Sequence, residues 1–566
     1  MRPLIECVPN FSEGRDMHVI RRITGAIEQV TGVTLLHVDP GESANRTVVT
    51  FVGDPDAVVE AAFQAIRVAA ATIDMRTHHG AHPRMGATDV CPLVPLRDIT
   101  LEETVAYARR LAARVGEELG IPVYLYEAAA ARPERRNLAV IRQGEYEALS
   151  TKLEDPEAQE IWRPDFGPQA FNPRTGATVI GARKLLVAYN VNLNTTSMRR
   201  ANAVAFDIRE RGRILRENNR LTGAIVRDEE GEPMRIPGTL KSVKAKGWYL
   251  AQYGICQVSM NLTDLDETPL HVAFDEVCEK ARARGLRVTG SQVVGMVPLH
   301  VLRAAGEHYL RKQQRSLGIP EREIIAVAVR TLGLNELAPF DPEERIIEYA
   351  LRAEDAPSML LDQSVRAFVN AVGSESPTPG GGSVSALVGA LGAALATMVA
   401  NGSAHKRGWD DRWETFSDWA VRGREVLTDL IQLVDADAAA YDAIVAARRL
   451  PGTTEAARAV REAALADAMR EATEVPLRTM RAALEALKVA KAMAEIGNPN
   501  ALSDAVVGGM CAEAAVGGAF LTVQMNVRYL EDADYVRSTL NEGRALNEEV
   551  RALQAEVLAL AEAMLD

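Results

Sequence analysis

The stretch THHGAHPRMGATDVCP, residues 77–92, is the part of the chain around which the first folding unit is arranged. It holds three of the nine histidines, together with two prolines and two glycines. His82 stands directly before Pro83, whose ring pushes the preceding residue into an extended conformation, so its imidazole projects from a stiffened loop. Imidazole titrates near neutrality, which suits it to proton transfer. A plain turn with hydrogen-bonded histidines fits the same string, and both interpretations stay open on local grounds.

The elements on either side of this loop follow the order strand, helix, two strands, helix, strand. The spacing of hydrophobic residues predicts strands at residues 4–8, 33–39, 46–52 and 90–94. It predicts helices at residues 17–30 and 54–71, the second of them capped by Asp54. A helix at about 101–119 and a strand at 123–126 extend the series. This order predicts a ferredoxin-like unit.

A long loop is expected after it, at residues 150–178, because the string has little periodicity and is rich in Pro and Gly. Trp162, Phe166 and Phe171 favour a functional loop, since disordered linkers are normally poor in aromatic residues.

From Lys184 the same order repeats, which predicts a second α/β half. A strand is expected from Lys184 to residue 192, followed by a helix at about 197–209 and two strands near 240–250 and 256–262. A helix at about 270–284 and a strand through residue 293 complete the half. The polar insertion at residues 213–237 contains DEEGEP and is expected to be an exposed excursion.

After residue 341 the chain becomes rich in Ala, Leu, Glu and Arg at helical spacing, beyond a connector interrupted by Pro357. Pro451, Pro476 and the GNPN string at Gly497 are expected to divide this part into long helices. The apolar run at residues 384–400 is shorter than the ~20 residues of a membrane span and predicts a tightly packed buried helix.

The predicted fold class is therefore α+β followed by all-α. Two ferredoxin-like α/β subdomains are expected at residues 1–182 and 183–341, a connector at 342–358, and an antiparallel helical bundle at 359–566.

Composition limits the classes of protein. Hydrophobic residues at 47% and charged residues at 25% are ordinary globular values. A net charge of −13 argues against a nucleic-acid surface, so an anionic substrate has to meet local clusters of Arg and Lys. The five cysteines are scattered and form no CxxC pair, so neither a disulfide framework nor a zinc site is expected. A protein of the reducing cytosol fits this pattern best. The N-terminus becomes polar too early for a signal peptide.

The first half offers several candidate site residues at strand ends or in loops, where sites tend to lie. They are Asp39, Asn45, Arg46, His82, Arg84 and Asp89. A metal site formed by His78, His79, His82 and Asp89 is the rival interpretation. Adjacent histidines in an extended loop point apart and no helical HExxH is present, so no metal is expected.

The helical part offers a glycine loop, PTPGGGS at residues 377–383, directly before the apolar helix. Gly380, Gly381 and Gly382 would let backbone amides approach a carboxylate or ring carbonyl at the positive end of that helix. A capping loop with small residues for close packing is the alternative.

LVDADAAAY supplies Asp435 and Asp437, which a step of ~100° per residue places on opposite edges of the buried stripe. Helix geometry alone does not choose between them, and solvated edge positions are the alternative. GNPNALSD, residues 497–504, either lines a pocket or is a simple connection with Ser503 or Asp504 as cap.

Taken together these strings resemble the formimidoyltransferase-cyclodeaminase family over nearly the whole chain. ECVPNFSEG, NRTVVTFVG, HPRMGATDVCP, PVYLYE, DFGP, TGARKLL and GSQVVGMVPL are similar to the transferase, and ERIIEY marks the junction. PTPGGGS and LVDADA are similar to the cyclodeaminase. Several independent strings in the family's order make the match specific, although fewer of them fall in the helical part.

The resemblance implies transfer of the formimidoyl group from N-formimidoyl-L-glutamate to N5 of tetrahydrofolate, then ring closure to 5,10-methenyltetrahydrofolate with loss of ammonia. His82 falls on the catalytic histidine and Asp437 on the cyclodeaminase catalytic residue. The folate-binding segment falls on Gly167, Pro168, Gln169, Ala170, Phe171, Asn172, Pro173, Arg174, Thr175 and Gly176. Further substrate contacts are expected from Asp39, Arg46, Arg84, Gly380, Gly381 and Gly382.

The family also implies a cytoplasmic homo-oligomer, with (poly)glutamylated tetrahydrofolate as co-substrate and no permanently bound cofactor, metal, nucleic acid or membrane. Amidine transfer needs orientation and proton movement rather than electron transfer. The insertion at 213–237 is longer than in the animal members. Three alternatives are a helical part acting as a methenyltetrahydrofolate cyclohydrolase, a metallohydrolase built on the histidines, and a non-catalytic folate-binding scaffold.

Overall fold

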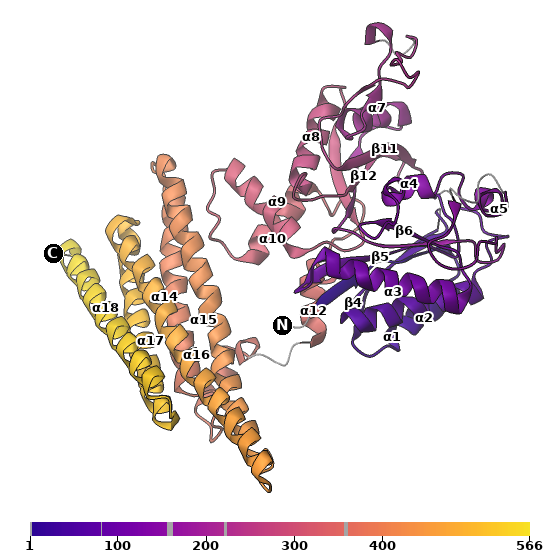
Figure 1. Cartoon of the computed structure of the whole chain (residues 1–566). Helices are drawn as coiled ribbons and strands as arrows, with labels where there is room; N and C mark the ends of the chain where they lie inside the picture. The colour runs from indigo at the N-terminus through magenta and orange to yellow at the C-terminus, as the bar shows by residue number, and fades with distance from the viewer. Residues whose placement is uncertain are drawn as a thin grey trace. The chain divides into compact units, whose positions relative to one another are not determined.

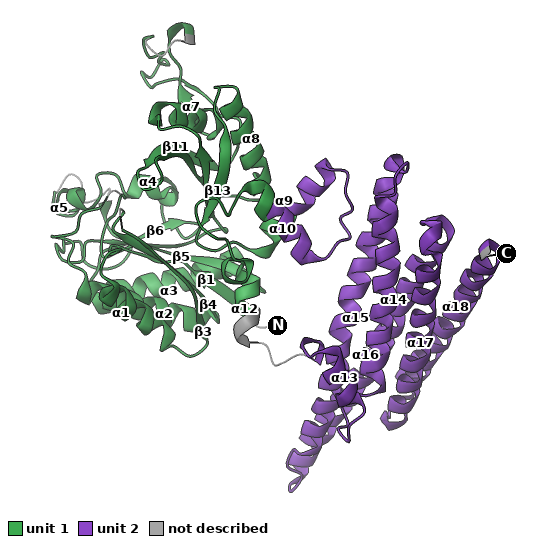
Figure 2. Cartoon of the chain, turned by 180° about the vertical axis from the view of Figure 1, so that it is seen from behind, with its two compact units in different colours: residues 1–305, 329–355 green, residues 306–328, 356–566 purple. Residues whose placement is uncertain are grey.

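The chain folds into two units, and the second takes a segment from within the first (Figure 2). The computed structural model describes residues 3–42, 44–80, 82–155, 162–219, 223–355 and 360–565. The α/β unit comprises residues 1–305 and 329–355, and the helical unit comprises 306–328 and 356–566. Residues 306–328, expected in the second α/β half, thus group with the helices. The domain boundaries given above stay predictions.

The first sheet has seven strands and contains the predicted ferredoxin-like arrangement. They are β1 (Leu4–Cys7), β2 (Asn10–Phe11), β3 (Val33–Gly41), β4 (Arg46–Gly53), β5 (Thr88–Arg97), β6 (Val123–Glu127) and β7 (Thr178–Ala182). β1 and β2 lie between β4 and β5, and β3 pairs with β4, all antiparallel. β7 is inserted between β5 and β6, parallel to both. The sequence did not predict β7, which follows the turn-rich segment directly.

Three helices cover one face of this sheet (Figure 1). They are α1 (Met17–Glu28), α2 (Pro55–Thr72) and α3 (Leu101–Leu119). Asp54 caps α2 as predicted, and Thr100 with Glu103 forms a capping box on α3. Val49 and Phe51 of β4 belong to the core beneath the helices. Because side chains alternate along a strand, Arg46 points to the opposite face, where the candidate site lies.

Short helices lie over that opposite face. They are α4 (Leu138–Ile141) and α5 (Leu149–Glu154), with the 3-10 turns η1 (Pro133–Arg136) and η2 (Tyr146–Ala148). Ile141 and Leu149 pack with Val90, Tyr124 and Val179 into a second, smaller core. This core fixes the segment between β6 and β7 against the sheet.

The second sheet repeats the ferredoxin-like order, as the sequence predicted. Its strands β8 (Val187–Leu193), β11 (Val243–Leu250), β12 (Ile255–Leu262) and β13 (Val288–Val294) pair antiparallel in the order β11-β12-β8-β13. α7 (Met198–Ile208) and α8 (Leu270–Arg282) are its helices. The insertion forms a small ribbon of β9 (Arg213–Ile214) and β10 (Arg235–Ile236), with η3 (Glu217–Asn219) between them. Every described side chain of residues 213–237 is at least partly exposed, as expected.

The helices after this sheet close the α/β unit and lead into the bundle. α9 (Leu299–Lys312), α10 (Glu321–Leu332), α11 (Pro342–Arg345) and α12 (Ile347–Asp355) come first. The bundle consists of η4 (Leu360–Asp362), α13 (Val365–Val372), α14 (Gly381–Ala404), η5 (Asp410–Arg412), α15 (Trp413–Arg448), α16 (Glu455–Ile496), η6 (Pro499–Ala501), α17 (Leu502–Asn526), η7 (Val527–Tyr529) and α18 (Ala533–Leu565). α14, α15, α16 and α17 share one core, and α18 packs on α16 and α17 (Figure 1).

α14 is the tightly packed apolar helix predicted from residues 384–400, although with 24 residues it is longer than that run. Small residues let its neighbours approach, since a Cβ at Gly392 would lie 2.6 Å from the carbonyl oxygen of Gly508 on α17. By length and composition alone, α14 and the segment Pro499–Tyr529 are apolar enough to cross a membrane. Both nevertheless pack in the bundle, with 61% and 44% of their most apolar stretches buried.

Pro476 does not divide the helices, contrary to the prediction. α16 runs through it without a break from Glu455 to Ile496. Proline removes the N–H that would bond the carbonyl four residues earlier, here that of Ala472. The Asn526 Nδ2 of α17 donates to this carbonyl at 2.6 Å. A partner from a neighbouring helix therefore offsets the lost hydrogen bond.

Candidate functional site

His82 lies half-buried in the loop between α2 and β5. Its Nδ1 is 2.7 Å from the carbonyl oxygen of Pro83. A carbonyl only accepts, so Nδ1 carries the proton and donates it, which leaves the lone pair on Nε2. Nε2 has no hydrogen-bond partner within the described part of the chain. The neutral ring is thus oriented with its basic nitrogen available.

A buried charge network lies beside His82. The Asp89 carboxylate is fully buried and accepts from the guanidinium groups of Arg46 and Arg142 and, at 2.9 Å, from the backbone N–H of Met85. Burial raises the pKa of Asp89, but the two guanidiniums outweigh it and hold that pKa below its ordinary value. Arg46 also donates to Asn10 Oδ1 at 3.0 Å. Two cations around one anion leave the network with a net positive charge.

Burial and this charge together set the protonation state of His82. Burial, followed by the positive charges of Arg46 and Arg142, lowers the pKa of His82 to about 4. The imidazole is therefore neutral near pH 7 and can accept a proton. Asn10 and Arg142 were not among the residues chosen from the sequence. Asn10 lies in the quoted ECVPNFSEG string, whereas nothing near Arg142 marked it.

The other two histidines of the loop have different surroundings. His78 is buried, donates from Nε2 to the carbonyl oxygen of Asn45 at 2.8 Å, and accepts at Nδ1 from Arg84 at 3.3 Å. His79 is exposed, and its backbone carbonyl accepts from the Asn45 side chain at 3.0 Å. No group of three or more His, Cys, Asp or Glu residues suited to a metal ion occurs in the ranges that the structure describes.

Arg84, expected to contact substrate, is held within the protein. Its guanidinium donates to the carboxylates of Glu145 and Glu147, at 2.6–3.1 Å, as well as to the ring and the carbonyl of His78. These interactions engage each of its N–H groups. The geometry therefore gives Arg84 a part in fixing the loop that carries His82, and its contact with substrate stays a prediction.

The segment of residues 167–176 lies directly against the His82 loop. The backbone N–H groups of Ala87 and Ala177 donate to the carbonyl oxygens of Thr175 and Met85, at 2.8 and 3.1 Å. Gly176 has φ +66°, and a Cβ there would lie 2.2 Å from the Met85 carbonyl oxygen, so only glycine permits this approach. These two hydrogen bonds join residues that are 88 and 92 positions apart in the sequence.

The ends of this segment differ in their exposure. Residues 167–170 are exposed, whereas Thr175 and Gly176 are buried. The Phe171 ring packs against Tyr146 with centroids 5.6 Å apart. Asp39, at the end of β3, is half-buried on the same face of the sheet as Arg46, because it pairs with Val48 of β4.

The second candidate site joins the two strings singled out in the helical part. Asp437 of α15 accepts at Oδ2 from the backbone N–H of Ser383 at 2.7 Å and from its hydroxyl at 3.0 Å. Ser383 lies in the first turn of α14, so the carboxylate sits at the positive end of that helix. Burial raises the pKa of Asp437, while the two hydrogen bonds from Ser383 lower it; the net shift is upward.

The glycine loop leaves room for this carboxylate. A Cβ at Gly382 would lie 2.0 Å from Asp437 Oδ1. A Cβ at Gly381 would meet nothing within 4 Å, so the space beside it is open. The loop was expected to receive a ligand at the helix end, and in the structure Asp437 fills part of that place. The open side is at Gly381.

Asp435 points to a different element, as the helix geometry indicated. Its Oδ1 accepts from the backbone N–H of Leu360 at 2.7 Å, so it anchors the start of the bundle. GNPNALSD forms the connection between α16 and α17. Its cap is Asn498, whose side chain accepts from the N–H of Asn500. The alternative interpretation of this string, a connection, is confirmed, but its cap at Ser503 or Asp504 is wrong, because α17 already begins at Leu502 without a side-chain cap.

Comparison with known proteins covers both units. Family profiles described as "Formiminotransferase domain, N-terminal subdomain" and "Formiminotransferase domain" match residues 4–183 and 188–352, and "Formiminotransferase-cyclodeaminase" matches 364–545. The formimidoyltransferase-cyclodeaminase of Rattus norvegicus is 43% identical over 563 residues, which cover 100% of this chain and 99% of the relative. This chain belongs to the formimidoyltransferase-cyclodeaminase family.

Two shorter relatives of the family each match one part of the chain. Glutamate formimidoyltransferase of Streptococcus pyogenes serotype M1 is 41% identical over 311 residues, covering 55% of this chain and 94% of the relative. Methenyltetrahydrofolate cyclohydrolase of Methylorubrum extorquens is 32% identical over 199 residues, covering 35% of this chain and 96% of the relative. The first of these relatives is named for the transferase activity alone, and the second for a cyclohydrolase activity on a folate.

Proposed function

We propose that this enzyme transfers the formimidoyl group of N-formimidoyl-L-glutamate to N5 of tetrahydrofolate and then cyclises 5-formimidoyltetrahydrofolate to 5,10-methenyltetrahydrofolate, releasing ammonia. The observation that carries the proposal is the 43% identity to a bifunctional relative over the full length of both chains. The two candidate sites support it, because each has a group suited to one of the two proton transfers.

In the transferase step, N5 attacks the formimidoyl carbon. Nε2 of His82 takes the proton from N5 and later returns a proton to the departing glutamate nitrogen. The low pKa of His82 keeps Nε2 unprotonated before attack. The positive network of Arg46 and Arg142 attracts the carboxylates of the donor, and Asp89 holds both arginines in place.

The folate is bound along residues 167–176, next to the His82 loop. The exposed stretch at residues 167–170 offers backbone groups, and Phe171 offers an aromatic face beside Tyr146. Asp39 contributes a further polar contact from the same sheet face. Tetrahydrofolate enters as a co-substrate, and proton movement and orientation suffice for amidine transfer.

In the cyclodeaminase step, N10 attacks the amidine carbon and the amino group leaves as ammonia. The carboxyl of Asp437, with its raised pKa, passes a proton to that amino group. Ser383 fixes its position, and the open space beside Gly381 receives the folate at the N-terminus of α14. Gly380, Gly381 and Gly382 together form the wall of this site.

A second candidate function for the helical unit is hydrolysis of the methenyl group, because a cyclohydrolase relative matches 35% of the chain at 32% identity. Ammonia release separates the two. Purified full-length chain supplied with 5-formimidoyltetrahydrofolate is expected to release ammonia in step with methenyl absorbance. With 5,10-methenyltetrahydrofolate supplied instead, loss of methenyl absorbance by a chain that releases no ammonia from 5-formimidoyltetrahydrofolate would assign the cyclohydrolase activity.

Substitution tests the separation of the two sites. His82→Ala is expected to lower transferase turnover by ~10²–10⁴ fold, the usual contribution of general acid-base catalysis, and to spare cyclisation of supplied 5-formimidoyltetrahydrofolate. Asp437→Ala is expected to do the reverse, with accumulation of that intermediate. Asp435→Ala is the matched control; if it stops cyclisation and Asp437→Ala does not, the assignment within the DAD string is wrong.

Assembly and location form the last part of the proposal. Several large apolar side chains of α14 and α17 are exposed: Leu391, Met398, Met510, Leu521 and Met525. Such a surface suits contact with a second copy of the chain, and we infer a homo-oligomer. A cytoplasmic location is supported by the cysteines, which are unpaired. Light scattering of the purified chain measures the oligomeric state.

A further inference from the structure

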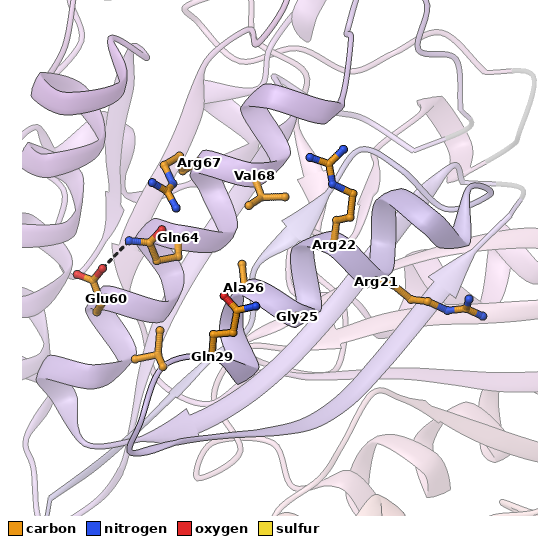
Figure 3. Close-up of a pocket in the computed structure, with 10 residues that line it drawn as sticks. Arg21, Arg22, Gly25, Ala26, Gln29, Glu60, Gln64, Arg67 and Val68 are labelled. Carbon is orange, nitrogen blue, oxygen red and sulfur yellow. Dashed lines mark hydrogen bonds between the residues drawn. The ribbon is translucent and has the colours of Figure 1, made fainter.

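A hollow of about 610 Å³ lies between α1 and α2, away from the two candidate sites. The hollow is lined by Arg21, Arg22, Gly25 and Ala26 of α1, by Gln29 and Val30 directly after α1, and by Glu60, Gln64, Arg67 and Val68 of α2. Figure 3 shows Arg67 of α2 and Arg22 of α1 on either side of Val68, while Arg21 points away from the hollow. These helices cover the face of the sheet opposite to Arg46.

The two arginines have no fixed partner. No hydrogen bond or ion pair of the Arg22 or Arg67 side chain occurs in the described ranges. Arginines of the same layer behave differently: Arg110 of α3 pairs with Asp56, and Arg114 pairs with Glu60 at 2.7 Å. Two unpaired cations therefore line one hollow in a chain whose net charge is −13.

The only acid that lines the hollow is already engaged. Glu60 accepts from Gln64 at 2.6 Å and from Arg114, and these two interactions are the largest causes that lower its pKa. The charge of Arg67 also lowers the pKa of Glu60, though by less than these two hydrogen bonds. One carboxylate is thus shared among several cations, and the hollow, which Arg21, Arg22 and Arg67 line, keeps a net positive charge. The amides of Gln29 and Gln64 add hydrogen-bonding groups further along the hollow (Figure 3).

Gly25 keeps the floor of the hollow open. It lies in the middle of α1, and a Cβ there would meet nothing within 4 Å. Packing does not require glycine at this position, and glycine in a helix costs about 1 kcal/mol relative to alanine. Because glycine has no side chain, space remains between the two helices at this position.

We propose that this hollow is a binding site for a small, multiply charged oxyanion, a phosphate ester or a polycarboxylate. The guanidinium groups of Arg22 and Arg67 hold the anion from two sides through charge-assisted hydrogen bonds, the geometry for which arginine is suited. The bound anion links α1 to α2. The site is independent of the proposed catalytic function.

Calorimetric titration of the full-length chain tests the proposal, with pyrophosphate and citrate as probes at an ionic strength held constant with NaCl. At least one probe is expected to bind, and the one that binds identifies phosphate or carboxylate chemistry. Arg22→Gln and Arg67→Gln are each expected to weaken binding about tenfold or more, because each removes hydrogen bonds between charged groups. Arg110→Gln, a paired arginine of the same layer, is the control and is expected to leave binding unchanged.

Filling the hollow gives a test that does not alter charge. Gly25→Leu is expected to abolish binding, while Gly25→Ala keeps it and raises the thermal stability of the chain. Thermal unfolding of each variant checks that it is folded. Binding of neither probe, equal weakening in Arg110→Gln, or full binding by a folded Gly25→Leu variant overturns the proposal.

Discussion

Gly382→Ala is the substitution whose effect follows most directly from the second site. The added Cβ would lie 2.0 Å from Oδ1 and 2.7 Å from Oδ2 of Asp437, whereas real Cβ atoms essentially never come closer than 3.0 Å to another heavy atom. The carboxylate therefore has to move by about 1 Å, a misplacement that can cost ~10²-fold in turnover. It also loses its hydrogen bonds from Ser383, at 2.7 and 3.0 Å.

The cost in stability is of the same size as the cost in activity, since a ~10²-fold loss of rate corresponds to about 2.7 kcal/mol. Loss of these two charge-assisted hydrogen bonds costs on the order of 2–4 kcal/mol. Alanine returns up to about 1 kcal/mol, because it favours the helix more than glycine does. The folded state is thus expected to lose roughly 1–4 kcal/mol, less than the ~5–15 kcal/mol that usually separates folded from unfolded protein, which leaves enough folded protein for a kinetic measurement.

The assay compares both activities of the purified full-length chain. Cyclisation is followed by methenyl absorbance and ammonia release from supplied 5-formimidoyltetrahydrofolate, and transfer by consumption of N-formimidoyl-L-glutamate. Gly382→Ala is expected to slow cyclisation ~10²-fold with transfer unchanged. Gly402→Ala is the control, since it lies on the same helix and its Cβ would meet nothing within 4 Å. Normal cyclisation by folded Gly382→Ala, or the same loss in Gly402→Ala, would refute the reasoning.

Three further predictions concern other parts of the chain. In the pH profile of transferase kcat/KM, the fall in activity on the acid side is expected near pH 4 rather than 6.5, because the pKa of His82 is lowered to about 4. Arg142→Gln removes a positive charge that lowers this pKa, so the fall is expected at higher pH in that variant. Gln554→Leu is expected to raise the free energy of unfolding by about 1–3 kcal/mol in urea titrations, since the amide is buried and neither of its polar atoms has a partner in the described ranges. Asn526→Ala leaves the carbonyl of Ala472 unpaired beside Pro476 and is expected to lower the same quantity by about 1–3 kcal/mol; an unchanged urea midpoint would contradict this.

Local patterns were sufficient for most of the α/β elements. Asp54 and Thr100 cap helices at the positions where the spacing of apolar residues begins, so both helix starts could be predicted. β7 was missed because its five residues follow a segment rich in Pro and Gly, and it is parallel to its neighbours rather than part of a hairpin. Such pairing leaves no short-range signal.

The candidate sites depend on contacts that no local string encodes. Arg142 reaches Asp89 across 53 residues, and Ser383 reaches Asp437 across 54. The sequence supplied one side of each contact, since His82 and Asp437 lie in recognisable strings. The predicted helix break at Pro476 was wrong for a related reason. The side chain of Asn526, which donates to the carbonyl that Pro476 leaves without a partner, belongs to another helix. Residue types could be chosen from the sequence, whereas their partners required the fold.

Placement of residues 306–328 in the helical unit has a consequence for synthesis of the chain on the ribosome. The N–H of Leu317 donates to the Ser417 hydroxyl, and the Ser316 hydroxyl bonds to Asn401, so these groups meet partners made 85 to 100 residues later. At roughly 5–20 residues per second, that is a delay of about 4 to 20 seconds. The segment is made after residues 1–305 of the α/β unit and before residues 329–355, which that unit needs for completion. In the nascent chain, residues 306–328 therefore have no partners from the bundle while the α/β unit completes its folding. Slower translation beyond residue 328 prolongs this period.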